Sequence, residues 1–396
     1  MSDSTFIKSF TVDAIENVTP ISVFLGDTKT HLIITGRNGS GKTSILKAIQ
    51  EEISILKSSG GNIQMLRSAR RKAEQAYANN STAETMANVN TYKSFKDGKI
   101  SITYGGGFGF KSDEEICIFF SASRALEPSI PSSITTSTLP SSAGDLPVVN
   151  SMILQHLVNL KAQRAFAGDD GDIESVEIID IWFESFKEAL RDVFENQELN
   201  LVFDRQALNF LIVDGNKKYT FNSLSSGQSA ILSIYAELLL RVEAAANGKH
   251  NISGIILIDE PETHLHASLQ KKILSFLVKT FPQFQFIVTT HSPFIISSLK
   301  NTKILNLEDG KIYDDFSSFS YEAILEEYMQ VDKYSIDVKR EVETIKKLLT
   351  SGDKQRAQAS LDDLLTTLKA SEFSVQASAE LALELSSIKL ALNNIE

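Results

Sequence analysis

A glycine-rich run between a predicted strand and a predicted helix narrows the possible folds of this chain more than any other segment. The run reads GRNGSGKT, from Gly36 to Thr43, and fits the pattern GxxxxGK[ST] without a mismatch. Apolar residues 31–34 lead into it, and residues 45–56 follow with apolar side chains at helical spacing. In this setting loop N–H groups surround phosphate oxygens, and the helix N-terminus adds a favourable partial charge. The predicted phosphate-binding residues are Arg37, Asn38, Gly39, Ser40, Gly41, Lys42, Thr43 and Ser44.

Two residues of this run carry specific chemistry. We expect Lys42 to reach the β- and γ-phosphates as a catalytic residue, and the Thr43 hydroxyl to bind Mg²⁺. The alternative is a glycine turn before an ordinary helix. The Lys-Thr pair, placed between strand and helix, disfavours that alternative.

A second apolar run, residues 255–258, ends in two acids, Asp259 and Glu260. Such a run is typical of a parallel strand buried on both faces. Its acids then lie at the carboxyl edge of the sheet, where α/β proteins bind ligands. We expect Asp259 to hold Mg²⁺ and Glu260 to act as the general base for an attacking water. Taken alone, a strand that ends in solvated acids would explain the pattern equally well.

A third strand end, after residues 286–290, places His291 where a ring N–H could touch a γ-phosphate. A capping or surface histidine is the alternative. The turn Leu224–Gln228 precedes a strongly apolar helix and offers another anion site at a helix N-terminus. There the alternative is a simple N-cap, because Ser225 or Ser226 would explain the helix start.

The order of the predicted elements favours an α/β protein. Strands alternate with helices between residues 228 and 289, which implies a mostly parallel central sheet. Helices are also expected at 149–166, 178–195 and 267–279, a hairpin turn or bulge at Gly105–Gly109, and a second hairpin at Asp214-Gly215. We predict a head at 1–57 and 98–315, a helical insertion at 58–97 and a C-terminal helical domain at 320–396.

Composition excludes several classes of protein. The single cysteine, Cys117, allows neither an intramolecular disulfide nor a cysteine-based zinc cluster, and it suits a reducing cytosol. The formal net charge is −11, so the chain is no general nucleic-acid coat, and the basic cluster Arg67–Lys72 is interpreted as a solvated helix face. No apolar run reaches the ~20 residues of a transmembrane helix. Residues 1–8 lack the apolar part of a secretion signal, so a cytoplasmic location is expected.

The four motifs, in this order, resemble those of the ATPase heads of the ABC superfamily. Leu224–Gln228 resembles the signature motif, with Ser226 where that family usually has glycine, and His291 matches the switch histidine. The resemblance implies ATP and Mg²⁺ as cofactors and two heads that sandwich ATP. The signature of one head would then cover the nucleotide of the other through Ser225, Ser226, Gly227 and Gln228.

Longer runs narrow the resemblance. The sequence DEPETHLH at Asp259–His266 and the sequence THSP at Thr290–Pro293 resemble the OLD/RecF-like group of bacterial ATPases. Ala267 stands where many members have proline, and no secure Q-loop glutamine is found. The segment Ser121–Arg124 also resembles one that these proteins carry, which would put Arg124 near the nucleotide or the dimer seam. His264 and His266 are interpreted as orienting the loop beside the general base rather than as metal ligands.

The head with its helical tail resembles the ATPase subunits of anti-phage systems such as Septu, PARIS and retron-associated modules. The resemblance implies an ATPase that forms ADP and phosphate, with turnover that can be slow. It also implies a homodimer, or a higher assembly of dimers, that senses or regulates a separate effector, a nuclease or toxin. Nucleic acid is a further expected partner, and a membrane is not.

Three alternatives stay open. A RecF/SMC-like DNA-repair or DNA-clamp ATPase predicts salt-dependent DNA binding. An ABC transporter ATPase is disfavoured by the 183 positions between Lys42 and Ser225. A non-hydrolysing scaffold predicts equal turnover in the wild type and in Glu260→Gln.

Overall fold

The structure is a computed structural model that describes residues 5–13, 15, 17–58, 100–105, 115–124, 126–135, 149–246, 252–329, 336–370 and 379–394. These residues fall into two compact units, Met1–Phe319 (the head unit) and Ser320–Glu396 (the C-terminal unit). The predicted helical insertion at 58–97 lies outside the described residues, apart from Ser58 at the end of a helix. The domain boundaries given above stay predictions.

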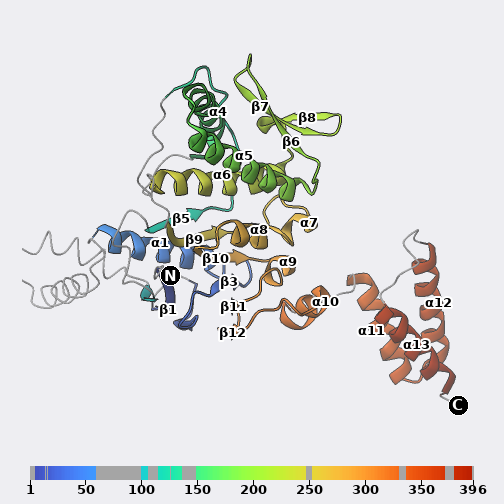
Figure 1. Cartoon of the computed structure of the whole chain (residues 1–396). Helices are drawn as coiled ribbons and strands as arrows, with labels where there is room; N and C mark the ends of the chain where they lie inside the picture. The colour runs from blue at the N-terminus through green and yellow to red at the C-terminus, as the bar shows by residue number, and fades with distance from the viewer. Residues whose placement is uncertain are drawn as a thin grey trace, which may run out of the picture. The chain divides into compact units, whose positions relative to one another are not determined.

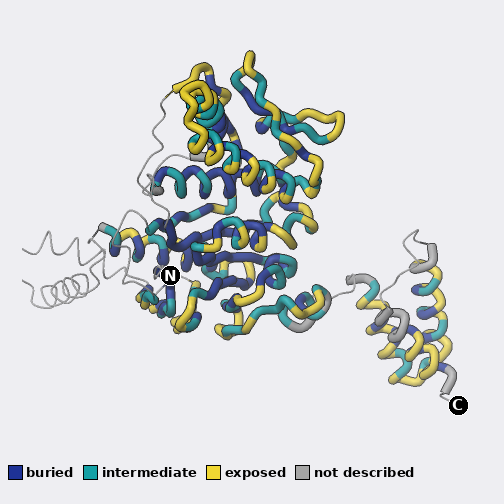
Figure 2. Tube along the Cα trace, viewed as in Figure 1, coloured by how far each residue is buried: buried dark blue, intermediate teal, exposed yellow. Residues whose placement is uncertain are grey.

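A six-stranded sheet forms the centre of the head unit (Figure 1). Its order is β12-β11-β3-β10-β9-β5, and every neighbouring pair is parallel except β11 with β12. Every residue of β3, β9 and β10 is buried, as the dark blue central strands of Figure 2 show. Burial on both faces accounts for their continuous apolar runs. The prediction of an α/β fold with a mostly parallel sheet is confirmed. The bounds are β3 (His31–Thr35), β5 (Glu115–Phe120), β9 (Ser253–Asp259), β10 (Phe284–Thr290), β11 (Thr302–Asn306) and β12 (Ile312–Tyr313).

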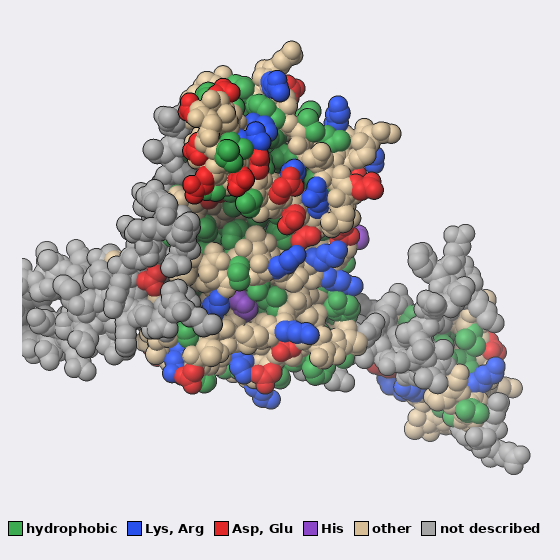
Figure 3. All heavy atoms as spheres, in the orientation of Figure 1, with side chains coloured by type: hydrophobic (Ala, Val, Ile, Leu, Met, Phe, Trp, Pro, Cys, Tyr) green, Lys and Arg blue, Asp and Glu red, His purple; other side chains and the backbone are tan. Residues whose placement is uncertain are grey.

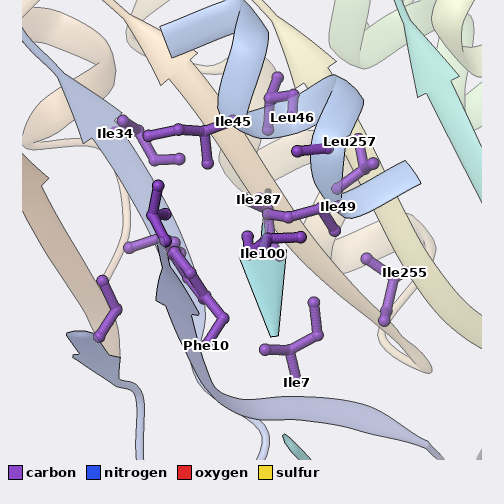
Figure 4. Close-up of a cluster of buried hydrophobic side chains, with 14 of the residues drawn as sticks. Ile7, Phe10, Ile34, Ile45, Leu46, Ile49, Ile100, Ile255, Leu257 and Ile287 are labelled. Atoms are coloured by element: carbon purple, nitrogen blue, oxygen red, sulfur yellow. The ribbon is translucent and has the colours of Figure 1, made fainter. Parts of the chain in front are cut away.

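Helix α1 (Lys42–Ser58) packs between this sheet and a smaller antiparallel one. The smaller sheet has the order β2-β1-β4, from β1 (Phe6–Val12), β2 (Ile21–Phe24) and β4 (Ile100–Gly105). Ile45 and Ile49 of α1 join a core that includes Phe10 of the small sheet and Leu257 of the large one (Figure 4). The amphipathic helix predicted after the glycine-rich run is therefore held from two sides, which fixes its N-terminus against the sheet edge.

Of the hairpin turn or bulge predicted at Gly105–Gly109, a hairpin between β4 and β5 is wrong, and a bulge would fall mostly outside the described residues. β4 pairs with β1 in the small sheet, whereas β5 pairs in parallel with β9 in the large sheet. Two strands that are adjacent in sequence thus belong to different sheets. Residues 106–114, which connect them, lie outside the described residues.

A helical layer with its own antiparallel sheet lies in the upper part of the head unit in Figure 1. It contains α4 (Ile153–Asp170), α5 (Ile173–Phe194) and α6 (Ser226–Ala246), two short 3₁₀ helices (Val149–Met152 and Phe221–Ser223), and β6 (Asn200–Asp204), β7 (Asn209–Asp214) and β8 (Lys217–Thr220). The predicted Asp214-Gly215 hairpin joins β7 to β8 and is confirmed. The exposed side of α4 and α5 carries many acidic side chains (Figure 3).

Helix α5 begins earlier than the predicted residue 178, because Asp172 caps it. The Asp172 carboxylate accepts a hydrogen bond from the Ser175 amide at 3.1 Å. The single helix predicted at 267–279 is two helices, α7 (Ala267–Gln270) and α8 (Ile273–Thr280). Between them the Lys272 amide donates to the Leu269 carbonyl at 3.1 Å, a tighter i→i+3 turn that interrupts the α-helical ladder.

The C-terminal unit has a core of its own. Its helices include α10 (Tyr321–Ala323), a π-helical turn (Ile324–Tyr328), α11 (Ile336–Thr350), α12 (Lys354–Ala370) and α13 (Ala379–Asn394). The last three, predicted from 3.6-residue spacing, enclose a cluster of buried apolar side chains: Val342, Ile345, Ala357, Leu361, Leu364, Leu385, Ile388 and Leu392. Within the described part of the chain, no helix has the length and apolar character needed to cross a bilayer.

Candidate nucleotide-binding site

The glycine-rich run forms a tight loop from the end of β3 to the start of α1. Gly39 and Gly41 have φ angles of +80° and +92°, a region that favours glycine because residues with side chains are strained there. A Cβ atom at Gly36 would lie 2.8 Å from the Ser40 hydroxyl. Arg37, Asn38 and Gly39 are exposed at the tip, and Ser44 is exposed on the first turn of α1. The loop therefore presents its backbone to solvent at a helix N-terminus, as a phosphate site requires.

Lys42 is 5% exposed and folds back over this loop. Its Nζ donates to the carbonyls of Gly36 at 3.0 Å and Arg37 at 3.1 Å, and lies 2.7 Å from His291 Nε2. Burial lowers the pKa of Lys42, and the nearby carboxylates of Glu260 and Asp259 oppose that shift. A buried ammonium held only by carbonyls and an imidazole has a strong electrostatic preference for an anion.

Thr43 and Asp259 meet at the carboxyl edge of the sheet. The Thr43 hydroxyl lies 2.8 and 3.0 Å from the two Asp259 carboxylate oxygens, and the Thr289 hydroxyl donates to Asp259 at 2.5 Å. A hydroxyl and a carboxylate beside a phosphate loop form the oxygen-rich donor set that suits Mg²⁺, which takes its other ligands from phosphates and water. These two residues would hold the ion, and a bound Mg²⁺ would neutralise charge on phosphate oxygens.

Glu260 and His291 face each other across the ends of β9 and β10. Glu260 Oε1 lies 3.2 Å from His291 Nε2, and both side chains are about one-third exposed. The same ring nitrogen contacts Lys42, so it accepts from Lys42 in one tautomer or donates toward Glu260 in the other, but not both at once. The pair can thus exchange a proton or orient a water next to the lysine.

Glu262 was not among the predicted site residues, although the structure places it beneath them. Its Oε1 accepts from the Thr290 hydroxyl at 2.6 Å and from the His291 amide at 2.7 Å, while Oε2 is buried without a partner. Burial raises the pKa of Glu262, and these hydrogen bonds oppose the shift. The carboxylate ties the two strand ends together, so it sets the position of His291. The sequence signal was its place in the run DEPETHLH, two residues after Glu260.

The predicted signature residues lie at the N-terminus of α6. Ser225 caps the helix: its hydroxyl donates to Gln228 Oε1 at 2.8 Å, and the Gln228 amide lies 3.4 Å from that hydroxyl. Ser225 and Ser226 are exposed. Gly227 is buried, and a Cβ atom there would lie 3.2 Å from the His264 carbonyl. The N-cap interpretation holds within one chain, and the exposed serines leave the contact with a second chain as a prediction.

Backbone hydrogen bonds shape the loop after Glu260. His264 and His266 are both exposed, and the His266 carbonyl accepts from the amides of Leu269 and Gln270 at the start of α7. In the described part of the chain, no group of three or more His, Cys, Asp or Glu residues is arranged to hold a metal ion. Arg37, a predicted phosphate-binding residue, pairs with Glu308 at 3.3 Å on the surface.

Residues 152–297 match a family described as "AAA domain, putative AbiEii toxin, Type IV TA system". The matched range includes Ser225, Asp259, Glu260 and His291. The chain is 36% identical over 115 residues to the Retron Ec83 probable ATPase of Escherichia coli, a match that covers 28% of this chain and 21% of that protein. It is 29% identical over 100 residues to the Retron Vc95 probable ATPase of Vibrio cholerae serotype O1 biovar El Tor, covering 24% and 20%. These matches span about a fifth of each retron protein.

Similarity to Septu protein PtuA of Bacillus thuringiensis extends further. The two chains are 24% identical over 352 residues, which covers 83% of this chain and 85% of PtuA. Among solved structures, an SMC head bound to the C-terminal winged-helix domain of ScpA aligns with 14% identity and a TM-score of 0.38, over 79% of this chain and 98% of that one. The resemblance to retron and Septu ATPases that the motifs indicated is confirmed.

Proposed function

We propose that this chain is an Mg²⁺-dependent ATPase that dimerises around ATP and regulates a separate nuclease or toxin effector in a bacterial anti-phage defence complex. One observation carries the ATPase part of the proposal. Lys42, Thr43, Asp259, Glu260 and His291, from three parts of the sequence, lie together at one edge of the parallel sheet. In this arrangement a lysine meets the phosphates, an oxygen pair suits Mg²⁺, and a carboxylate lies beside a histidine for water activation.

The defence role is supported by similarity. The match to Septu protein PtuA covers 83% of this chain and 85% of PtuA, so it extends well beyond the motif residues. The two retron ATPases match over a shorter range but at higher identity.

The dimer is supported by the exposed start of α6. Ser225 and Ser226 are exposed at this helix start, and Gly227 fixes the same turn against the loop that follows Glu260. Because a helix N-terminus attracts anions, a second head can place this one on the nucleotide of the first. The C-terminal unit is the expected attachment point for the effector.

Nucleotide binding and turnover test the ATPase directly. The wild type is expected to hydrolyse MgATP, Glu260→Gln to bind it with turnover lower by about 10²-fold, and Lys42→Ala to lose nucleotide binding. Tight ATP binding by Lys42→Ala, or equal turnover by wild type and Glu260→Gln, would contradict the assignment.

Purification of the native complex tests the regulatory role. The full chain is expected to co-purify with a nuclease or toxin, and a chain truncated before Val338 to lose it. A wild-type chain that purifies with nucleic acid alone would contradict this role and favour the DNA-clamp alternative.

A further inference from the structure

Arg124 contacts the backbone of the proposed Mg²⁺ ligand, Asp259, and of the proposed general base, Glu260. It follows β5, the parallel neighbour of β9, and reaches across to the end of that strand. Nη1 donates to the Asp259 carbonyl at 3.0 Å, and Nη2 donates to the Glu260 carbonyl at 2.8 Å. One planar guanidinium thus grips two consecutive backbone carbonyls, a geometry that a lysine or a neutral side chain cannot reproduce.

The backbone that it grips is strained. Glu260 has a φ of +44°, in the left-handed region that residues with side chains seldom adopt. Pro261 follows, and a proline drives the preceding residue toward extended conformations. Such a conformation persists only where the surroundings hold it.

Hydrogen bonds hold Glu260 on each side of its Cα. The amide donates to the Thr289 carbonyl at 3.1 Å and lies 3.2 Å from the Thr289 hydroxyl. The carbonyl accepts from Arg124 at 2.8 Å, and also from the amide and the hydroxyl of Thr263, at 3.1 and 2.9 Å, within the turn that follows. Because the peptide groups on both sides of Glu260 are fixed, its side chain points from the end of β9 toward His291.

The surroundings keep Arg124 charged. Burial lowers its pKa to about 10, and the carboxylates of Glu262, Asp259 and Glu260 oppose that shift. At neutral pH the guanidinium therefore remains a cation among three acids. The same segment touches α6, because the Leu126 amide donates to the Ser229 hydroxyl at 3.0 Å.

We propose that Arg124 is the positioning residue for the general base, holding the Glu260 backbone in its left-handed conformation so that the carboxylate stays beside His291. Arg124 acts through Glu260 and touches no reacting atom. The inference rests on the proposed ATPase function and adds a residue to it.

Single-turnover MgATP hydrolysis and binding of a fluorescent ATP analogue test this role in the full chain. Arg124→Ala is expected to lower the rate of hydrolysis by about 10²-fold, close to the effect of Glu260→Gln, with analogue affinity within about threefold of wild type. Arg124→Lys keeps the charge and one donor, so it is expected to recover part of the rate. The Arg124→Ala/Glu260→Gln double variant is expected to be no slower than Glu260→Gln alone, since both changes remove the same contribution.

Arg164→Ala is the matched control, because that arginine pairs with Asp180 on the surface of the helical layer and should leave the rate unchanged. Arg124 has no positioning role if Arg124→Ala and Arg124→Lys both hydrolyse within threefold of wild type. The role is equally overturned if the double variant is slower than the wild type by the product of the two single-variant effects, as independent contributions would give. If Arg124→Ala does not fold, the same test is made with Arg124→Lys and the Arg124→Lys/Glu260→Gln double variant. Failure of the ATPase proposal would look different, since wild type and Glu260→Gln would then turn over alike.

Discussion

His31 is a buried histidine whose protonation opposes folding. It is 8% exposed at the start of β3, and its Nδ1 accepts from the Phe286 amide at 3.1 Å. Burial, helped by the charge of Lys29, lowers the pKa of His31 to about 4 from 6.5. The unfolded chain therefore binds a proton below pH 6.5 that the folded chain accepts only near pH 4. The free energy of unfolding falls as the pH drops through this window.

We expect this residue to account for about 3 kcal/mol of stability lost between pH 7 and pH 4. Urea denaturation at both pH values measures the loss. His31→Asn keeps an acceptor for the Phe286 amide but does not titrate, so its loss should be smaller by that amount. Equal losses in the two proteins would show that His31 binds its proton over the same pH range in the folded and the unfolded chain, which would contradict its burial.

The sequence predicted those site residues whose side chains lie at the ends of parallel strands. Asp259 and His291 directly follow buried apolar runs, and such runs end at the same edge of a sheet. Glu262 and Arg124 could not be assigned roles this way. Their function depends on contacts across strand ends, such as the grip of Arg124 on the Asp259 carbonyl, which no spacing in one segment reveals.

Ser225, at the start of α6, caps its own helix and is also predicted to face the nucleotide of a second head. Ser225 caps the helix through its reciprocal contact with Gln228. Ser225→Ala should cost about 1 kcal/mol by loss of the cap. Ser225→Asp keeps an N-cap of equal quality but brings a negative charge to the surface that would face a second head's triphosphate.

We expect Ser225→Asp to melt like the wild type while losing ATP-dependent dimerisation and at least tenfold in turnover. Thermal denaturation and steady-state hydrolysis, measured beside Ser225→Ala, separate the two effects. Wild-type turnover in Ser225→Asp would mean that the serine only caps its helix.

Gly254 sets how closely β5 approaches β9. It has a φ of +148°, and a Cβ atom there would lie 1.9 Å from the Ile116 carbonyl oxygen. Gly254→Ala should therefore push β5 away and lower the free energy of unfolding by about 3 kcal/mol or more. Gly168→Ala is the control, since a Cβ atom there makes only an ordinary contact at 4.0 Å with Val176. A Gly254→Ala protein that melts with the wild type would contradict the close strand pairing.

Helices and strands were predicted well where one hydrophobic periodicity runs through the whole element. They were predicted poorly where a single contact sets the bounds or the pairing of the element. The buried strands β9 and β10 and the helices of the C-terminal unit follow from their patterns. The early start of α5 depends on the Asp172 cap, and the division between α7 and α8 on a tight turn at Lys272. β4 and β5 belong to different sheets because their partners, β1 and β9, lie far away in the sequence. The alternation of apolar and polar residues in the two strands is similar, so it does not tell which sheet each one joins.

At the scale of the whole molecule, each unit has its own core. The three long helices of the C-terminal unit bury eight apolar side chains against one another. We expect residues 320–396, expressed alone, to be helical and to unfold cooperatively by circular dichroism. Leu361 is 1% exposed, so Leu361→Ala should lower the free energy of unfolding by about 2–4 kcal/mol. Leu390 is 61% exposed, so Leu390→Ala should change the free energy of unfolding little. A non-cooperative melt of the isolated segment would contradict an independent core.

The central claim is that two heads close on ATP, with the glycine-rich loop of one facing the capped start of α6 of the other. Light scattering of Glu260→Gln with and without MgATP tests it most directly, because this variant should bind nucleotide without releasing the closed state by hydrolysis. The account predicts that MgATP doubles the molar mass of the scattering species, and that adding Ser225→Asp to the same protein abolishes the change. An ATP-bound Glu260→Gln protein whose mass is unaltered by the nucleotide would contradict the account.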